Sequence, residues 1–150
     1  MSSVIVLVGL PGSGKSTWAL AQGITVLSSD DVRVLLADDV HNQQIHGAVF
    51  STMRYLLRRR LELGAKATII DATNLLPAHR KPWRQLGEAA GAEVRAVYFA
   101  TPVEECLRRN ALRARVVPAE AIREMAAKLR PPTVGEGFAS VQLVEYREIG

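Results

Sequence analysis

The chain has 150 residues, of which 48% are hydrophobic and 23% are charged, the composition of a folded globular protein. Its length fits one domain, so we expect residues 1–150 to form a single domain. The sequence shows neither a basic leader nor an apolar run near the ~20 residues that span a membrane, which predicts a cytoplasmic protein without a membrane partner. The single cysteine, Cys106, fits a reducing compartment. A net charge of +4, with fifteen arginines and four lysines, allows a polyanionic partner.

The first predicted strand, residues 4–8, leads into a phosphate-binding loop, residues 9–16 (Gly-Leu-Pro-Gly-Ser-Gly-Lys-Ser). The glycines let successive backbone N–H groups point at a phosphate, and the helix expected from Ser16 presents its positive end to the same anion. Lys15 places a cation between the β- and γ-phosphates, and Ser16 offers a hydroxyl to Mg²⁺. The loop therefore predicts a site for ATP or GTP whose contact residues are Gly12, Ser13, Gly14, Lys15, Ser16 and Thr17.

A second predicted strand, residues 25–28, is followed by residues 29–33 (Ser-Asp-Asp-Val-Arg), which open a helix. A carboxylate at this strand end can accept a proton from an acceptor hydroxyl. Arg33 would share the helical face of Asp30, within reach of a phosphate. The alternative interpretation is structural, with Asp30 or Asp31 capping the helix.

A long amphipathic helix is predicted from about residue 44 to 63, and the arginines at 58–60 are more typical of its solvated face than of a nucleic-acid contact. The third predicted strand, residues 67–70, ends in Asp71. An aspartate at this place beside the loop is the usual second anchor for hydrated Mg²⁺. Thr73 and Asn74 are short donors and acceptors suited to a phosphate or hydroxyl, or, alternatively, turn and cap residues of the next helix.

A helix predicted at 77–90 and a strand at 94–100 precede a helix predicted at 103–112 that is rich in arginine. Arg109 and Arg113 are spaced i,i+4, and Arg113 and Arg115 lie near the expected helix end. Cations over a migrating phosphoryl group stabilise its spreading charge, and a mobile arginine-bearing lid excludes water. The alternative is a solvated helix end whose cations complement the helix dipole. The pattern leaves open whether Arg113 or Arg115 is the main lid arginine.

The last predicted elements are a helix that begins at Pro118 and stops before Pro131, and a strand at 141–144. Strands that alternate with helices across short turns predict an α/β fold, a five-stranded parallel sheet with helices on both faces. Ligands of such folds bind beyond the carboxyl ends of the strands. The polar residues that follow each predicted strand are therefore expected to meet in one site.

In this order, these segments resemble the kinase domain of the 5′-OH polynucleotide kinases, the phage enzyme and the bacterial end-healing enzymes. The resemblance covers essentially the whole chain. It implies a P-loop NTPase fold of adenylate-kinase-like architecture with an arginine-bearing lid, here expected as a stand-alone kinase domain. The matching segments are residues 9–19, 29–33, 71–74, 109–113 followed by 116–118, and 136–138 (Glu-Gly-Phe).

The resemblance also implies roles for individual residues. Asp30 would be the general base, and Arg113 would stabilise the transferring phosphoryl group from the lid together with Lys15. The expected nucleotide contacts outside the loop are Arg109 and Arg113, and the expected metal ligands are Ser16 and Asp71. The expected acceptor-binding residues are Arg33, Asp71, Thr73, Asn74 and Arg80.

The predicted reaction is transfer of the ATP γ-phosphoryl group, with Mg²⁺, to the 5′-OH end of DNA or RNA. A separate ligase or phosphatase is a candidate partner in such end healing. One alternative is a P-loop kinase of a small-molecule hydroxyl, which would differ in the acceptor pocket alone. Another is a nucleotide-dependent switch, although the guanine-reading segment of small GTPases is absent from the sequence.

Overall fold

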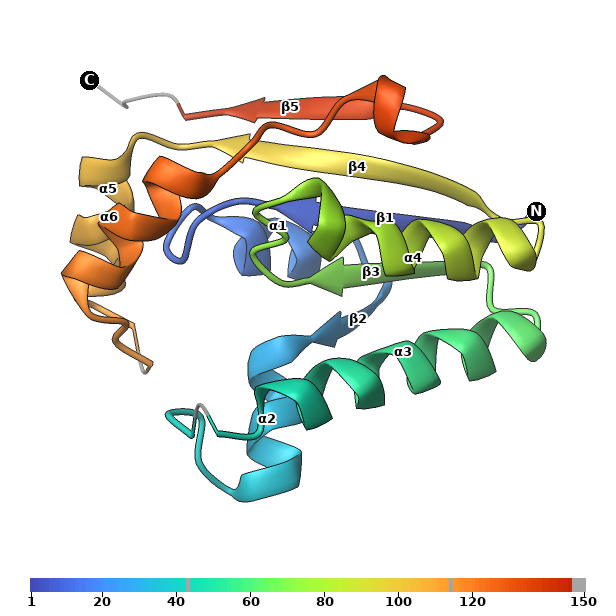
Figure 1. The fold of residues 1–150 in the computed structure, drawn as a ribbon, viewed down its shortest axis with the longest axis horizontal. Helices are drawn as coiled ribbons and strands as arrows, with labels where there is room; N and C mark the ends of the chain where they lie inside the picture. The colour runs from blue at the N-terminus through green and yellow to red at the C-terminus, as the bar shows by residue number, and fades with distance from the viewer. Residues whose placement is uncertain (43, 114, 147–150) are drawn as a thin grey trace.

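The computed structural model describes residues 1–42, 44–113 and 115–146. In this part of the chain, one parallel sheet of five strands has the spatial order β2-β3-β1-β4-β5 (Figure 1). This arrangement confirms the predicted fold class. The strands are β1 Ser3–Val8, β2 Thr25–Ser28, β3 Ala67–Asp71, β4 Glu93–Ala100 and β5 Val141–Glu145.

Helices connect the strands and cover the sheet. The long helix α3 and its neighbour α4 lie side by side along one face, and α5 and α6 gather at the carboxyl ends of the strands (Figure 1). The helices are α1 Lys15–Ala21, α2 Ser29–Ala37, α3 His46–Glu62, α4 Pro77–Ala89, α5 Val103–Asn110 and α6 Ala119–Lys128, with a short 3₁₀ turn, η1, at Val134–Glu136. Within the described residues, no helix is both long and apolar enough to cross a membrane.

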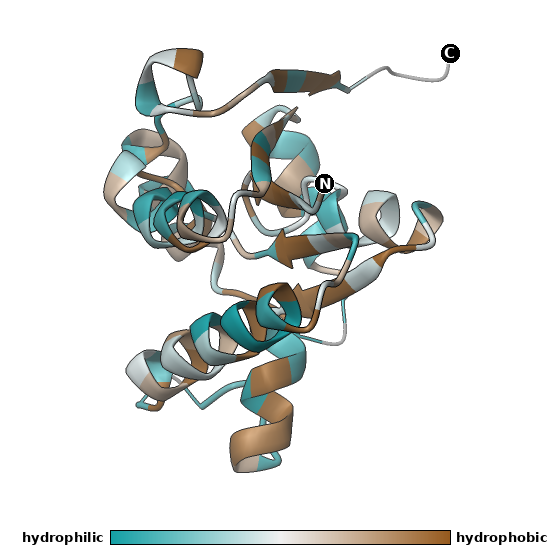
Figure 2. Cartoon of the chain, turned by 90° about the vertical axis from the view of Figure 1, so that its right-hand side faces the viewer, coloured by the Kyte–Doolittle hydropathy of each residue, from teal (hydrophilic) through white to brown (hydrophobic). Residues whose placement is uncertain are grey.

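The central strand β1 is buried on both faces, as its continuous apolar sequence predicts. Val4 and Val6 pack with α3 residues such as Met53, whereas Ile5 and Leu7 pack with Ala19 of α1. The strands of the sheet are accordingly coloured mainly as hydrophobic residues in Figure 2. A strand packed on both faces is a rigid scaffold, and it holds the loop that follows it in a defined position.

The predicted helix at 103–112 ends earlier, at Asn110. The Asn110 side chain turns back on the chain, where its Nδ2 donates to the carbonyl of Val117 and its Oδ1 accepts from the backbone N–H of Val117. These two bonds satisfy both backbone polar groups of Val117. They also join residues 110 and 117 within the arginine-bearing segments 109–113 and 116–118, which the resemblance identifies as the lid.

Candidate active site

The phosphate-binding loop depends on backbone conformations that favour glycine. Gly12 has φ 82° and Gly14 has φ 100°, both in the left-handed region. A side chain at Gly12 would also overlap the carbonyl oxygen of Cys106, which lies directly against the loop. Thr101 fixes the loop from the other side, where its Oγ1 donates to the carbonyl of Ser13 at 2.8 Å.

Lys15 and Ser16 are the last two residues of the loop and begin α1, and the resemblance implies contacts with phosphate and Mg²⁺ for them. The Lys15 ammonium donates to the carbonyl of Leu10 at 2.9 Å. Burial lowers the pKa of Lys15 from 10.5 to about 8, and nearby Asp71 opposes this shift. Ser16 Oγ donates to Asp71 Oδ2 at 2.7 Å, so the hydroxyl and the carboxylate expected to hold the metal are neighbours. Two adjacent oxygens suit Mg²⁺, which retains water and phosphate oxygens for its other positions.

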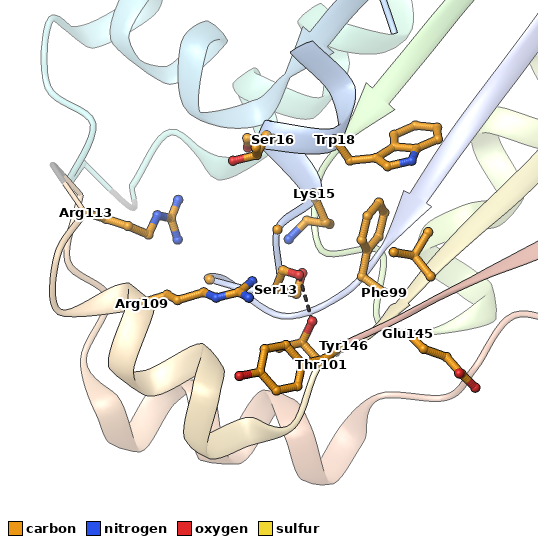
Figure 3. A pocket seen from close by; sticks show the side chains of 14 residues that line it. Ser13, Lys15, Ser16, Trp18, Phe99, Thr101, Arg109, Arg113, Glu145 and Tyr146 are labelled. Carbon is orange, nitrogen blue, oxygen red and sulfur yellow. Dashed lines mark hydrogen bonds between the residues drawn. The ribbon is translucent and has the colours of Figure 1, made fainter. Parts of the chain in front are cut away.

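A cavity of about 600 Å³ opens over this loop and is lined by residues of α1, β4, α5 and the end of β5 (Figure 3). Trp18 and Phe99 pack edge to face on one wall, with ring centroids 5.7 Å apart. On another wall the Arg109 guanidinium lies 5.4 Å from the ring centroid of Tyr146. Aromatic faces and a cation suit the base and phosphates of a nucleotide, so we refer to this space as the nucleotide cavity.

Ser13 and Arg113 line this cavity. Their Oγ and Nη1 atoms are buried and have no hydrogen-bond partner among the described residues, so an additional acceptor would stabilise them. Both are donors, as are the Lys15 ammonium and the backbone N–H groups of the loop. The residues present therefore fit a bound polyphosphate.

Asp30 lies in the first turn of α2 and joins the lid to this helix. Its Oδ1 accepts from Arg115 Nη1, and its Oδ2 accepts from Arg113 Nη2 at 3.3 Å. Arg33 Nη1 is 3.9 Å from the same carboxylate. Asp30, Arg113 and Arg115 line a small cavity of about 60 Å³, which shares Lys15 and Arg113 with the nucleotide cavity. The predicted base and both candidate lid arginines thus meet beside the phosphate-binding loop.

A second large cavity, about 590 Å³ in volume, adjoins the small cavity that Asp30 lines. It shares Thr73 and Arg115 with the small cavity, so the three cavities follow one another past the carboxyl ends of β1, β2 and β3. Arg33 and Arg115 supply positive charge to its wall, and apolar side chains such as Phe50 and Met125 line the remainder. A cationic and partly apolar wall fits an anionic acceptor with a flat or apolar body, so we refer to this second large cavity as the acceptor cavity.

Arg33 is almost fully buried at 2% exposure, and its contacts fix its orientation. Its Nε donates to the carbonyl of Asn42 at 3.0 Å, and its Nη2 lies 3.4 Å from His46 Nδ1. Burial and the neighbouring Arg33 lower the pKa of His46, so this imidazole is neutral at pH 7. A neutral His46 can accept from the guanidinium and leaves Arg33 as the charged partner for an anion.

Two expected acceptor-binding residues are instead enclosed in the protein. Asn74, 3% exposed, donates from Nδ2 to the carbonyl of Leu7 and accepts at Oδ1 from Trp83 Nε1. Arg80 is fully buried, and all three of its guanidinium nitrogens are bonded, to Glu136 and to the carbonyls of Asn74 and Arg130. With their polar atoms occupied and no surface on the cavities, Asn74 and Arg80 have structural roles here, in place of the substrate contacts that the resemblance implies.

Thr73 lines both the small cavity and the acceptor cavity, as expected, while its carbonyl accepts from the Gly9 N–H at 3.1 Å. The alternative interpretation, in which Asp30 or Asp31 caps α2, is wrong. Ser28 is the capping residue, and its Oγ accepts from the backbone N–H of Asp31. Burial and the neighbouring carboxylate of Asp30 raise the pKa of Asp31.

Sequence reasoning missed several cavity residues. Tyr146, Phe99 and Thr101 line the nucleotide cavity, and His46 and Phe50 line the acceptor cavity. Position after a predicted strand was a usable signal for Thr101 and Tyr146, which follow β4 and β5. The sequence contained no comparable signal for His46 and Phe50, because they come from the start of a helix that is brought to the site by packing against α2.

This sheet order with a phosphate-binding loop and arginine-bearing lid segment defines a P-loop kinase fold. A family model described as an AAA domain matches residues 4–132, which is most of the chain. The chain therefore belongs to this family.

Two curated relatives are similar over nearly the whole chain. A bifunctional polynucleotide phosphatase/kinase of Schizosaccharomyces pombe is 24% identical, over 96% of this chain and 34% of the relative. An L-seryl-tRNA(Sec) kinase of Methanococcus maripaludis is 25% identical, over 97% of this chain and 62% of the relative. This chain thus spans less than two thirds of the length of either protein.

Among solved structures, a chain of the Pnkp1/Rnl/Hen1 RNA repair complex is similar, with a TM-score of 0.73 and 24% identity. The match covers 85% of this chain and 44% of that chain, and it establishes a shared fold. Together with the family match, these relatives confirm the resemblance to polynucleotide kinases that the sequence motifs indicate.

Proposed function

We propose that the protein transfers the γ-phosphoryl group of ATP to the 5′-OH end of DNA or RNA. The observation that carries this proposal is that Asp30 lines a small cavity that shares residues with both the nucleotide cavity and the cationic acceptor cavity. The similarity to a polynucleotide phosphatase/kinase supports a polynucleotide acceptor. Arg33 and Arg115 support an anionic acceptor, because guanidinium groups bind phosphate oxygens in a fork.

In this reaction the acceptor oxygen attacks the γ-phosphorus, and Asp30 takes the hydroxyl proton as the bond forms. Both Asp30 oxygens accept hydrogen bonds from lid arginines, and departure of one guanidinium would open that oxygen to the acceptor hydroxyl. Arg113 is placed to move in this way, because it lines the nucleotide cavity as well as the small cavity of Asp30. Moving from Asp30 to the γ-phosphoryl oxygens would free the base and stabilise the transferring group in one step.

Ser16 and Asp71 would hold Mg²⁺, which would supply positive charge to the transferring phosphates when bound. Lys15 would exchange its bond to the Leu10 carbonyl for phosphate oxygens. Arg33 would hold a phosphate of the acceptor, since its orientation is already fixed by Asn42 and His46. These contacts position both substrates, and positioning supplies most of the catalysis in phosphoryl transfer.

The test is transfer of label from γ-labelled ATP to a 5′-OH single-stranded oligonucleotide in the presence of Mg²⁺. Asp30→Asn should lower kcat by roughly 10²- to 10⁴-fold, the contribution of a general base, while nucleotide binding persists. Asp31→Asn is the matched control, because this neighbouring carboxylate lines none of the three cavities. Nucleotide binding without transfer to any 5′-OH end would instead favour a small hydroxyl acceptor and call for a metabolite screen.

A further inference from the structure

A fourth cavity lies outside the site described so far, in a groove between α3 and α4, the two helices that run side by side in Figure 1. Its volume is about 550 Å³. Arg54, Tyr55 and Arg58 line it from α3, and Pro82 and Gln85 line it from α4. None of the catalytic steps above uses these side chains.

The α3 side of the groove is cationic and aromatic. Tyr55 is 52% exposed, and the Arg58 guanidinium lies 5.6 Å from its ring centroid. Arg54 is exposed, and no carboxylate of the described residues forms an ion pair with it. Arg58 is 3.7 Å from Glu62, an exposed pair that water and salt screen strongly. Both guanidinium groups are therefore available to an anion in solution.

The acceptor cavity and the groove share no lining residue, but consecutive residues of α3 line them. Phe50 lines the acceptor cavity, and the next residue, Ser51, lines the groove. Phe50, Arg54 and Arg58 are spaced i,i+4, which places them in one row on the helix, about 6 Å apart along its axis. The row thus leads from the acceptor cavity into the groove.

We propose that this groove binds the nucleotides that follow the 5′-terminal one in a single-stranded acceptor. Arg54 and Arg58 contact phosphates, and a base stacks on Tyr55, the combination by which proteins hold single strands without reading sequence. This assignment rests on the proposed polynucleotide kinase function. It also differs from the sequence interpretation of residues 58–60 as a solvated face, because Arg58 lines the groove, whereas Arg60 bonds to Thr68 Oγ1.

The first test measures binding of a fluorescent single strand of about eight nucleotides by anisotropy at several salt concentrations. Arg54→Ala/Arg58→Ala should weaken binding and reduce the slope of log K against log salt by about 1.4, the value for two lost phosphate contacts. Tyr55→Ala should weaken binding roughly 5- to 150-fold, the value of one stacked base. The matched control is Arg59→Ala/Arg123→Ala, which removes two exposed arginines outside the groove.

Binding to Arg54→Ala/Arg58→Ala that equals the control would overturn the inference. Displacement of the strand by poly-glutamate as effectively as by unlabelled strand would assign the groove to acidic proteins, which also overturns it. These binding results do not depend on catalysis.

The second test compares kcat/KM for 5′-OH acceptors of two and about eight nucleotides. The wild type should prefer the longer acceptor, and Arg54→Ala/Arg58→Ala should lose that preference while the Arg59→Ala/Arg123→Ala control keeps it. Transfer to both acceptors without any length preference would overturn the groove alone. Absence of transfer to either acceptor would overturn the proposed function, and the binding test would still decide the groove.

Discussion

The ion pair between the fully buried Arg80 and Glu136 allows a test of whether Arg80 has a structural role or contacts the substrate. Glu136 accepts from Arg80 Nε at 3.0 Å and from Nη2 at 2.9 Å, and the Arg80 side chain is fully buried. The remaining guanidinium nitrogen holds the carbonyls of Asn74 and Arg130, which lie far apart in the chain. Glu136→Gln removes the negative charge with little change of shape. It should therefore destabilise the protein while leaving the acceptor cavity intact.

The expected magnitude follows from burial. Breaking one side of a buried, hydrogen-bonded ion pair costs about 3–5 kcal/mol, because the remaining charge is left uncompensated. In a protein of this size, each 1 kcal/mol lowers the melting temperature by about 2–4 °C. Glu136→Gln should thus lower the melting temperature by roughly 6–20 °C. The control is Glu88→Gln in the pair of Arg84 with the exposed Glu88, a substitution that should cost less than about 1 kcal/mol.

Urea unfolding gives the free energies of both variants, and the transfer assay is run below their melting temperatures. KM for the acceptor should be unchanged in Glu136→Gln, since neither member of the pair lines a cavity. A loss below about 1 kcal/mol would refute the burial argument. A raised KM at unchanged stability would instead return Arg80 to the acceptor contact that the resemblance implies.

Three further predictions concern the phosphate-binding loop and α2. Because the pKa of Lys15 is lowered to about 8, nucleotide affinity should fall as pH rises through this value and the ammonium loses its charge. Lys15→Met should bind nucleotide weakly at every pH, and titration calorimetry measures both proteins. The same shift should make the free energy of unfolding rise with pH between about 8 and 10.5. In this range the unfolded chain still binds a proton at Lys15 that the folded chain has lost. Gly12→Ala should destabilise the protein more than Gly91→Ala, because Gly91 has a positive φ but open space around it; chemical unfolding compares the two. Ser28→Ala should cost about 1 kcal/mol as a lost helix cap in the same assay.

The sequence predicted the sheet well because burial and turn chemistry are local signals. β2 is found at residues 25–28, as expected, and α4 begins at Pro77, where proline suits a first helical position. The rule that ligands bind beyond parallel strands also predicted that Asp30 and Asp71 would meet the loop. Asp71 does so directly through its bond with Ser16.

The rule that ligands bind beyond parallel strands does not predict the direction in which an individual side chain points. Asn74 comes directly after Thr73 in the turn that follows β3, yet its side chain is buried and bonds to Leu7 and Trp83. Arg80 finds its partner 56 residues away, at Glu136. Such partners are set by packing of whole elements, which no local pattern encodes. The resemblance matched these positions to motifs of the family but could not separate a structural role from a substrate contact.

The charges around the loop explain why the site favours a polyphosphate. Lys15, Arg33, Arg113 and Arg115 gather around two carboxylates, so positive charge is in excess among these groups. Burial is the main cause of the lowered pKa of Lys15, and repulsion from Arg113 lowers it further. Phosphate oxygens between these cations would reduce that repulsion. The Asp30 carboxylate partly balances the lid arginines until then, so the same residue that would accept the proton also holds the lid in place.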